Sequence, residues 1–294
     1  MNIHLVDGTY ELFRHYYALP KEQNAAGLEI GALKGVVHSL LGLIADGATH
    51  VAVATDHVIE SFRNEMWPGY KDGSGIEPDL LAQFHPLEDA LRAVGIVVWP
   101  MVEHEADDGL ASGAAIALAD TRVEQVLICT PDKDLAQCVV ADRVVQFDRR
   151  KRLIIDHDGV VAKFGVEPES IPDYLALVGD SADGFPGLPG WGAKSAGKVL
   201  GRYGYLEAVP KDAEQWDVAV RGAARLAATL REHMDEAMLF RRLATLDRQA
   251  PVSATVDELA WHGPAEGWRP VLEGLGLESV VRRMPGIMNA ANIE

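Results

Sequence analysis

The sequence predicts an α/β fold, with a mainly parallel sheet flanked by helices and a C-terminal helical subdomain. Short apolar runs alternate with amphipathic helical patterns, which is typical of sheets built from β-α-β units. Four apolar runs predict buried parallel strands, at residues 2–6, 50–55, 95–102 and 125–129. Helical patterns lie between these runs, at residues 33–47, 79–95 and 106–120.

The composition is that of a globular protein. With 294 residues, the chain is long enough for about two domains, and its 48% hydrophobic and 24% charged residues are typical values. The spacing of its two cysteines, Cys129 and Cys138, matches no zinc motif and favours a reducing, intracellular setting. Because no apolar stretch has the length of a transmembrane helix and no signal peptide is evident, we expect a cytoplasmic protein without a membrane partner.

The charge balance bears on the choice of partner. Acidic residues outnumber basic residues by 44 to 27, which gives a formal net charge of -17. A charge of this sign repels polyanions and by itself argues against a nucleic acid as partner. The conclusion reverses if many of the acids bind metal cations, because a local basic patch can then bind phosphates.

Acidic residues follow each predicted strand. They are Asp7, Asp56, Glu105, Asp107, Asp108, Asp132 and Asp134. Ligands of parallel sheets bind beyond the carboxyl ends of the strands, where these side chains would converge. A single aspartate in such a place is more often a turn former or a helix cap. However, "EADD" and "PDKD" bring several acids together, and their mutual repulsion is unfavourable without a cation.

Asp180 and Asp183 extend this acidic set to nine. They lie three residues apart, which predicts that both occupy one face of a helical turn after "SIPDYLALVG". Oxygen ligands without a histidine or cysteine at a useful spacing favour Mg²⁺ or Mn²⁺ over zinc. Counting all nine carboxylates as metal ligands roughly halves the net negative charge.

A stretch without acids begins at Gly187, in "GLPGWGAKSAGKVL". Its glycines predict a tight loop whose N–H groups can approach a phosphate at the start of the helix from Ala193. The spacing is neither a dinucleotide-binding fingerprint nor a P-loop. Lys194, Lys198 and Arg202 recur every four residues, so they share one face of that helix.

A solvated basic face is the alternative for these three bases, but the glycine loop and the upstream acids favour a clamp for a nucleic-acid backbone. A second basic run, residues 149–152, lies between two β-like runs and predicts a solvated hairpin turn, with contact to a DNA backbone as the alternative. A cationic clamp next to a two-metal site predicts hydrolysis of a nucleic-acid strand.

Several motifs together resemble one known family. They are "VDGTYELFRHYYALP", "TDHVIESFRNEMWPGYK", "EHEADDGLA", "TPDKDLAQ", "KFGVEPESIPDYLALVGDSADGFPGLPGWGAKSAGKVL" and "LREHMDEAMLFRRLATLDRQAPV". They resemble the 5'-nuclease family, which includes flap endonucleases and the N-terminal 5'-3' exonuclease domain of bacterial DNA polymerase I. The resemblance runs nearly end to end, and we expect a stand-alone nuclease.

The resemblance implies a PIN-like core at residues 1–165 with an arch at about 61–100, and a helical DNA-binding subdomain at residues 166–294. A helix-three-turn-helix, of the helix-hairpin-helix kind, falls on residues 187–200; in the family it binds duplex DNA and a monovalent ion, here K⁺. The implied activity is that of a metal-dependent, structure-selective 5'-3' exonuclease and flap endonuclease in DNA replication and repair. The implied substrates are flapped, nicked or gapped DNA, or an RNA–DNA hybrid, cleaved by a monomer with two or more Mg²⁺ ions.

The resemblance also assigns roles to residues. The family's metal ligands fall on the nine carboxylates already named. The cationic side chains that the family places at the scissile phosphate correspond to Arg63 and Lys71. Tyr70 is expected to stack on a base, whereas a core role explains Trp67 at least as well. The residues implied to bind the duplex are Gly187, Gly190, Gly192, Lys194, Ser195, Lys198 and Arg202.

The sequence departs from the family in the arch and in one loop. Ser74 stands where polymerase-type members usually have an arginine, and Gly184 stands in place of the family's usual asparagine. Within residues 61–100 the acids outnumber the bases by two to one, which argues against efficient threading of a single strand.

Other functions share some of these features. A PIN-type RNA nuclease has the acidic cluster but normally lacks a helix-three-turn-helix of this length. A catalytically weak DNA-structure-binding protein would result if the acidic arch prevented threading, although all nine acids are retained. A phosphatase suggested by "VDGT" is excluded, because its nucleophilic aspartate would fall on Leu5.

Overall fold

The computed structural model describes residues 1–291. They form two compact units, each assembled from separate segments of the chain. Unit 1 comprises Met1–Ser61, Gly73–Thr130 and the chain from Asp247 onwards, and unit 2 comprises Phe62–Asp72 and Pro131–Leu246. Across the described residues, the structure contains no helix with the length and apolar character needed to span a membrane.

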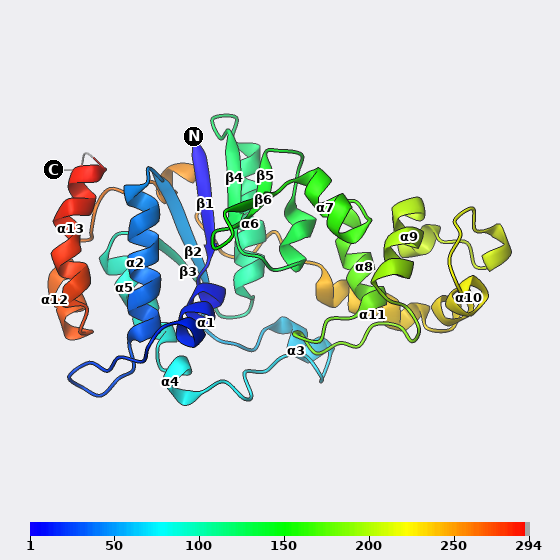
Figure 1. Ribbon diagram of the computed structural model, residues 1–294, viewed down its shortest axis with the longest axis horizontal. Coiled ribbons are helices and arrows are strands. Elements are labelled where there is room, and N and C mark those ends of the chain that lie inside the picture. The colour runs from blue at the N-terminus through cyan, green and yellow to red at the C-terminus, as the bar shows by residue number, and fades with distance from the viewer. Residues whose placement is uncertain (292–294) are drawn as a thin grey trace. The chain divides into compact units, whose positions relative to one another are not determined.

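Unit 1 is built on parallel strands that lie side by side in the order β3-β2-β1-β4 (Figure 1). These strands are β1 (Asn2–Asp7), β2 (His50–Asp56), β3 (Val97–Met101) and β4 (Gln125–Cys129). The helices of the unit are α1 (Gly8–Ala18), α2 (Gly31–Ala45), α4 (Pro78–Leu81), α5 (Phe84–Ala93), α6 (Ala106–Ala119), the 3-10 helix η5 (Val256–Leu259), α12 (Trp268–Gly274) and α13 (Glu278–Ala290).

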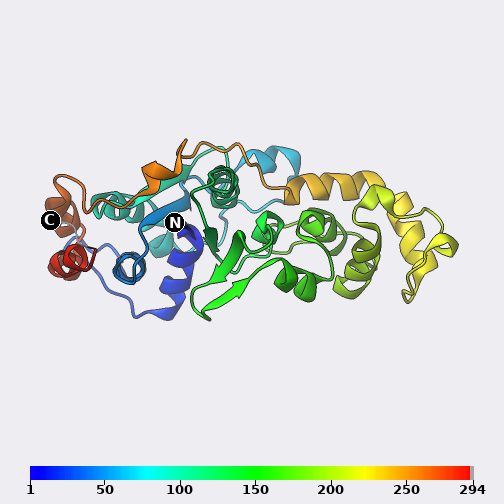
Figure 2. The same ribbon diagram turned by 90° about the horizontal axis from the view of Figure 1, so that it is seen from above.

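Helices cover both faces of these strands. The chain crosses the sheet in one direction from β1 to β2 and in the opposite direction from β3 to β4. Because such connections are right-handed, α2 and α6 must lie on opposite faces, as the view from above shows (Figure 2). Burial on both sides explains why Leu5, Val53 and Ile128 are fully buried and why the strands are continuous apolar runs.

The strand register brings acidic residues to one edge of unit 1. Asp7 pairs with Ala54 at the end of β1, and Asp56 pairs with Met101 at the end of β2. Helix α1 starts directly after Asp7 because Gly8 has no side chain. A Cβ atom on Gly8 would lie 2.6 Å from Cγ1 of Val53.

Unit 2 is helical apart from one antiparallel hairpin, β5 (Val144–Asp148) with β6 (Leu153–Ile155). Its α-helices are α3 (Phe62–Met66), α7 (His157–Phe164), α8 (Ile171–Val178), α9 (Ala193–Tyr203), α10 (Ala223–Glu232) and α11 (Met234–Ala244). Its 3-10 helices are η1 (Asp134–Cys138), η2 (Pro168–Ser170), η3 (Leu206–Ala208) and η4 (Ala213–Gln215).

The core of unit 2 joins the short segment Phe62–Asp72 to helices far along the chain. Phe240 of α11 stacks on Phe185 with ring centroids 5.7 Å apart, and Trp67 meets Phe240 edge-on at 5.4 Å. Apolar side chains of α8, α9 and α10, such as Leu175 and Val199, also belong to this core. Aromatic contacts of this kind add to the free energy gained by burial.

The predicted fold class is confirmed, with changes at two places. All four predicted parallel strands form, and the basic run at residues 149–152 is the turn of the β5-β6 hairpin. The helix predicted at residues 79–95 is two helices, α4 and α5, separated at Gln83, whose side-chain oxygen accepts a hydrogen bond from the N–H of Leu33. Since α5 and β3 belong to the α/β unit, the irregular part of the expected arch ends before Phe84.

The compact units also differ from the predicted boundary between residues 165 and 166. Residues from Pro131 onwards pack with the helical unit, because η1 and the hairpin share its core. From Asp247 the chain returns to unit 1, where the N–H of Trp261 donates to the carbonyl of Thr49 at 2.8 Å. The final residues of the predicted second domain, 292–294, lie outside the described part of the chain.

Candidate metal centre and nucleic-acid interface

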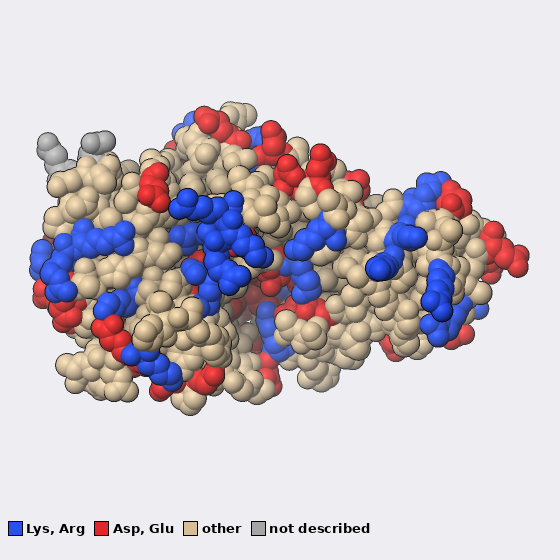
Figure 3. Space-filling view, in the orientation of Figure 1, with Lys and Arg blue, Asp and Glu red and all other residues tan. Residues whose placement is uncertain are grey.

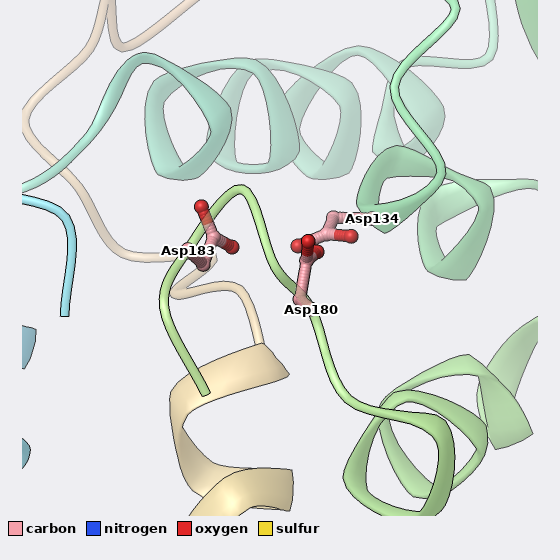
Figure 4. Close-up of side chains that lie close together, drawn as sticks. All are labelled: Asp134, Asp180 and Asp183. Carbon is pink, nitrogen blue, oxygen red and sulfur yellow. The ribbon is translucent and has the colours of Figure 1, made fainter. Parts of the chain in front are cut away.

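Three carboxylates of unit 2 lie close together. One oxygen from each of Asp134, Asp180 and Asp183 lies within 4.8 Å of the others. Figure 4 shows their side chains meeting between η1 and the loop that follows α8. Their exposed fractions are only 4%, 4% and 8%. Three negative charges held this close and away from water repel one another strongly.

Asp180 and Asp183 lie on a closed loop, which corrects the prediction of a helical turn. The N–H of Asp180 donates to the carbonyl of Phe185 at 2.8 Å, and the N–H of Phe185 donates back at 3.0 Å. Gly184 completes this loop with a φ of 84°. A Cβ atom at Gly184 would lie 2.0 Å from the carbonyl oxygen of Gly69, so this backbone leaves no room for a side chain here.

Asp134 lies in the least favourable electrostatic environment of the three. Burial raises the pKa of Asp134 well above its ordinary value, and repulsion from Asp132 and Asp183 raises it further. Its Oδ1 atom is buried and accepts no hydrogen bond. Asp132 lies beside it, since its Oδ1 accepts the N–H of Asp134 at 2.9 Å. A buried carboxylate oxygen without a donor fits a bound cation, and an all-oxygen donor set fits a hard divalent one.

Two lysines partly neutralise these carboxylates. Lys133 Nζ donates to Oδ2 of Asp180 and lies 3.6 Å from Oδ1 of Asp134. Burial lowers the pKa of Lys133, but the charge of Asp134 and the hydrogen bond to Asp180 outweigh it, so the pKa is raised overall. Lys71 Nζ lies 3.1 Å from Oδ1 of Asp183, and the Lys71 N–H donates to the Asp183 carbonyl at 3.1 Å.

The other predicted ligands belong to unit 1, where two of them end strands. Asp7 caps α1, because its Oδ1 accepts the N–H of Tyr10 at 2.8 Å. Its Oδ2 accepts the hydroxyl of Thr130 at 3.1 Å. Asp56 Oδ1 accepts the N–H of Ala106, the first residue of α6, at 2.8 Å. Both carboxylates therefore also hold the local backbone in place.

The remaining three lie at the start of α6. Glu105 and Asp108 form a capping box, in which Asp108 Oδ2 accepts the N–H of Glu105 at 3.0 Å. The other oxygen of Asp108 accepts the N–H of Asp247 at 2.8 Å, and Glu105 accepts the hydroxyl of Ser61 at 2.8 Å. Asp107 is half-buried in the first turn. These capping contacts agree with the alternative considered for single acids, and metal binding by the unit 1 carboxylates stays a prediction.

Arg63 lies in a setting different from the one expected. Its side chain is fully buried, with 1% of its surface exposed. Nε donates to the carbonyl of Leu243 at 2.8 Å, and Nη2 donates to that of Thr245 at 3.1 Å. These carbonyls lie at the C-terminal end of α11, which needs donors from outside the helix. The expectation that Arg63 faces a phosphate is therefore corrected: the side chain anchors α3 to α11.

The two aromatic residues of the same segment are also core residues. Tyr70 has an exposed fraction of 5%, so the expected stacking on a base is corrected because the ring is covered by protein. Trp67 packs on Phe240 and its Nε1 donates to the carbonyl of Gly184 at 3.1 Å. The structure thus favours the core role for Trp67 and ties it to the loop that carries Asp183.

The basic face of α9 divides into exposed and paired charges. Lys194 and Lys198 are exposed and, within residues 1–291, make neither a hydrogen bond nor an ion pair. Arg202 differs from them, because its Nε and Nη2 donate to the carboxylate of Asp217 at 2.8 and 2.5 Å. Arg202 therefore differs from the two lysines in having an acidic partner, and its contact with a duplex stays a prediction.

The glycine loop before α9 has a packed part and an open part. Gly187 has a φ of 70°, and a Cβ atom on it would lie 2.3 Å from the N atom of Gly179, so its glycine is required by packing. In contrast, no atom lies within 4 Å of a Cβ atom built on Gly192. The hydroxyl of Ser195 accepts the N–H of Gly192 at 3.1 Å and donates to its carbonyl at 2.9 Å. Ser195 is thus a helix-capping residue, and its contact with a duplex stays a prediction.

Three residues of interest were missed by sequence reasoning. Lys133 stands between two acids in "PDKD", and that position was its only signal. Lys163 and Tyr174 line a groove together with the lysines of α9. No sequence pattern shows this, because the groove depends on how α7, α8 and α9 pack.

A mainly parallel α/β unit with acids at its strand ends, together with a helical unit that carries a buried carboxylate cluster, has the architecture of a 5'-nuclease. Two family models match the chain: the N-terminal resolvase-like domain of the 5'-3' exonucleases at residues 2–165, and their C-terminal SAM fold at residues 166–267. The protein belongs to the 5'-3' exonuclease family.

Its similarity to known proteins agrees with this assignment. Over 288 residues it is 33% identical to DNA polymerase I of Bacillus caldotenax, a match that covers 95% of this chain and 32% of the polymerase. The chain thus spans about a third of the length of this relative. A solved structure of T5 5'-exonuclease with bound divalent zinc ions has a TM-score of 0.66 at 20% identity, covering 99% of this chain and all of that one. The catalytic core of Rad2 in complex with DNA substrate has a TM-score of 0.62 at 15% identity, covering 97% of this chain and 91% of that one.

Proposed function

We propose that the protein is a divalent-metal-dependent, structure-selective 5'-3' exonuclease and flap endonuclease that hydrolyses phosphodiesters of DNA. The observation that carries this proposal is the buried cluster of Asp134, Asp180 and Asp183, with a carboxylate oxygen that no donor satisfies. Family membership of both parts of the chain supports it. The proposed substrates are flapped, nicked or gapped duplexes, with an RNA–DNA hybrid as a further one, processed by a monomer in cytoplasmic DNA replication and repair.

In this proposal the cluster holds Mg²⁺, or Mn²⁺, and Asp132 assists from the same turn. The carboxylates of unit 1 remain proposed ligands, with two or more ions in all. Such ions, when bound, lower the pKa of a water molecule and stabilise charge on a phosphoryl group. Lys71 is the cation proposed to donate a hydrogen bond to a phosphate oxygen, because Asp183 holds its Nζ at the edge of the cluster.

The same proposal gives α9 the role of holding the duplex. Lys194 and Lys198 are exposed cations on one helix face, and the loop at Gly192 is open. Cations without acidic partners keep their charge available for phosphates, and each phosphate contact releases counterions from DNA. A K⁺ ion at the helix-three-turn-helix is a further part of the proposal.

Cleavage of a 5'-labelled double-flap DNA and of a nicked duplex, each with Mg²⁺ and with EDTA, tests the function. We expect cuts near the junction with Mg²⁺, none with EDTA, and none with Asp134→Asn. The matched control is Asp235→Asn, which removes an exposed carboxylate of unit 2 outside the cluster and should cut at the normal rate.

Normal cleavage by Asp134→Asn, or by the unaltered protein in EDTA, contradicts the metal site. If only the nicked duplex is cleaved, the metal site is supported, but the part of the expected arch that precedes Phe84 does not let a flap pass. Tight DNA binding without any cleavage favours the second candidate, a DNA-structure-binding protein. The excess of acids in the expected arch supports this candidate.

A further inference from the structure

Two glutamine side chains hold the turn that carries Asp132 and Asp134. Nε2 of Gln146, in β5, donates to the carbonyl of Asp132 at 2.5 Å. Nε2 of Gln137, in η1, donates to the carbonyl of Asp134 at 2.9 Å. The Asp132 side chain also accepts the N–H of Asp134. Together these contacts fix the backbone from which both carboxylates project.

The two glutamines differ in what their oxygens do. Oε1 of Gln137 accepts the N–H of Leu246 at 3.0 Å, and its Nε2 also donates to the carbonyl of Ala244 at 2.9 Å. Both ends of this amide are therefore satisfied. Gln146 is only 1% exposed, yet its Oε1 accepts no hydrogen bond from any of residues 1–291. A buried amide oxygen without a donor is unfavourable, because it has lost water and gained no partner.

The orientation of the Gln146 amide follows from its partner. A carbonyl only accepts hydrogen bonds, so the nitrogen of the amide faces Asp132 and the oxygen faces away. Basic donors are close in the chain. On the face drawn in Figure 3, Lys and Arg side chains gather over the region that the β5-β6 hairpin occupies in Figure 1. Four of them form the turn at residues 149–152, but none of these four donates to Gln146 Oε1.

The buried oxygens that lack a donor meet at this one turn. Within the described residues, the buried side-chain oxygens that accept no hydrogen bond are Asp134 Oδ1 and Gln146 Oε1. Oε1 of Gln146 is bonded to the same carbon atom as the Nε2 that contacts Asp132, so it also lies at the turn. A cation explains both atoms at once, because carboxylate and amide oxygens are both ligands of hard divalent ions.

Stability does not explain a glutamine at this position. Its neighbours in β5, Val144 and Val145, are buried and apolar. Methionine would fill the same space without an unsatisfied oxygen. The hydrogen bond to Asp132 would be lost, but Asp132 is exposed, so water can replace that donor. Residues that break a packing rule in this way are expected at functional sites.

We propose that Gln146 is a further residue of the metal centre. Its Nε2 positions the turn that carries Asp132 and Asp134, and its Oε1 is a neutral oxygen ligand for a divalent cation there. The inference rests on the proposed function and deepens it, since it adds a side chain of β5 to the carboxylates. A neutral ligand supplies the ion with another oxygen without adding a further negative charge to carboxylates that already repel one another.

Isothermal titration calorimetry with Mg²⁺ and urea unfolding in EDTA test the proposal on the whole protein without DNA. Gln146→Met should weaken Mg²⁺ binding about tenfold. It should not lower the urea midpoint in EDTA, because the buried oxygen without a donor is removed. A residue with a structural role alone would give the reverse result, with a lowered midpoint and normal Mg²⁺ affinity.

Two other glutamines of unit 2 serve as controls. Gln215→Met removes an exposed amide of η4 and should change neither the Mg²⁺ affinity nor the midpoint. Gln137→Met should lower the midpoint in EDTA, because it leaves the buried groups of Ala244 and Leu246 without partners.

Normal Mg²⁺ affinity in Gln146→Met overturns the inference while leaving the proposed function intact. A lowered midpoint or a failure to fold overturns it as well, even with weaker Mg²⁺ binding, because the loss of affinity would then follow from a disturbed fold. If the unaltered protein binds no Mg²⁺, the proposed function is contradicted, and the inference with it.

Discussion

The ammonium group of Lys71 lies 3.1 Å from Oδ1 of Asp183, one of the three clustered carboxylates. A third of the Lys71 side chain is exposed, against 11% of the Asp183 side chain, so the pair lies at the boundary between the cluster and solvent. The backbone hydrogen bond between the same two residues fixes their register. Lys71 is therefore positioned by the acidic loop itself.

Lys71→Met should slow cleavage about 100-fold to 1000-fold with little loss of DNA affinity, because removal of one donor to a developing negative charge has an effect of this order. Single-turnover cleavage and anisotropy measure the two quantities. Lys211→Met serves as the control for loss of a positive charge. A normal cleavage rate would show that Lys71 does not act at the phosphate.

Lys133→Met should lower the melting temperature more in EDTA than in Mg²⁺. Lys133 compensates the charges of Asp134 and Asp180, and a bound divalent cation would supply that compensation in its place. Thermal unfolding with and without Mg²⁺ measures the difference. An equal drop in both conditions would mean that Lys133 does not neutralise the cluster.

Gly184→Ala should destabilise the loop that carries Asp180 and Asp183, because its Cβ atom would lie 2.0 Å from the carbonyl of Gly69. We expect a loss of more than about 2 kcal/mol, together with a reduced stabilisation by Mg²⁺. Gly222→Ala is the matched control, since Gly222 has a φ of 77° and no atom within 4 Å of its Cβ position. Equal losses in urea unfolding would show that the loop can absorb the methyl group.

Arg63→Met should reduce the free energy of unfolding by roughly 2–4 kcal/mol, because the carbonyls of Leu243 and Thr245 lose buried donors. Urea unfolding measures this loss. The alternative role of Arg63 at the phosphate predicts the reverse pattern, with normal stability and lost cleavage. That pattern would overturn the anchoring role.

His38, in α2 of unit 1, predicts a pH dependence of stability. Burial lowers the pKa of His38 below 6.5, and the positive charges of Arg283 and Lys34 lower it further. Below pH 6.5 the unfolded chain therefore binds a proton that the folded protein does not, so stability falls as the pH decreases. His38→Gln should make the free energy of unfolding less dependent on pH between 7.5 and 5.5. An unchanged dependence in urea unfolding would assign it to other groups.

The sheet was predictable because buried parallel strands are continuous apolar runs in the sequence. Runs such as "HVAVAT" are apolar on both faces and end in an acid where the chain leaves the sheet. The three acids of the buried carboxylate cluster were also among the candidates that the sequence analysis named, because acids are so numerous after the strands. Their grouping was not predictable, because it depends on a loop closed by backbone hydrogen bonds between Asp180 and Phe185.

Cationic residues were harder to place. Arg63 has the sequence context of an exposed helix, and only the carbonyls of α11, about 180 residues further on, show why it is buried. Arg202 shares its spacing with Lys194 and Lys198, but Asp217 neutralises it from a separate turn. Such contacts join segments that are distant in the sequence, so the local spacing of residues does not predict them.

The segment Phe62–Asp72 packs on α11 through Arg63 and Trp67, although the family models divide the chain at residues 165 and 166. A chimera that joins the first part of this protein to the second part of a relative would therefore combine two surfaces that did not evolve together. A working chimera would have to take residues 62–72 and residues 234–246 from the same parent protein. The boundary that divides the sequence is thus a poor place to exchange halves between relatives.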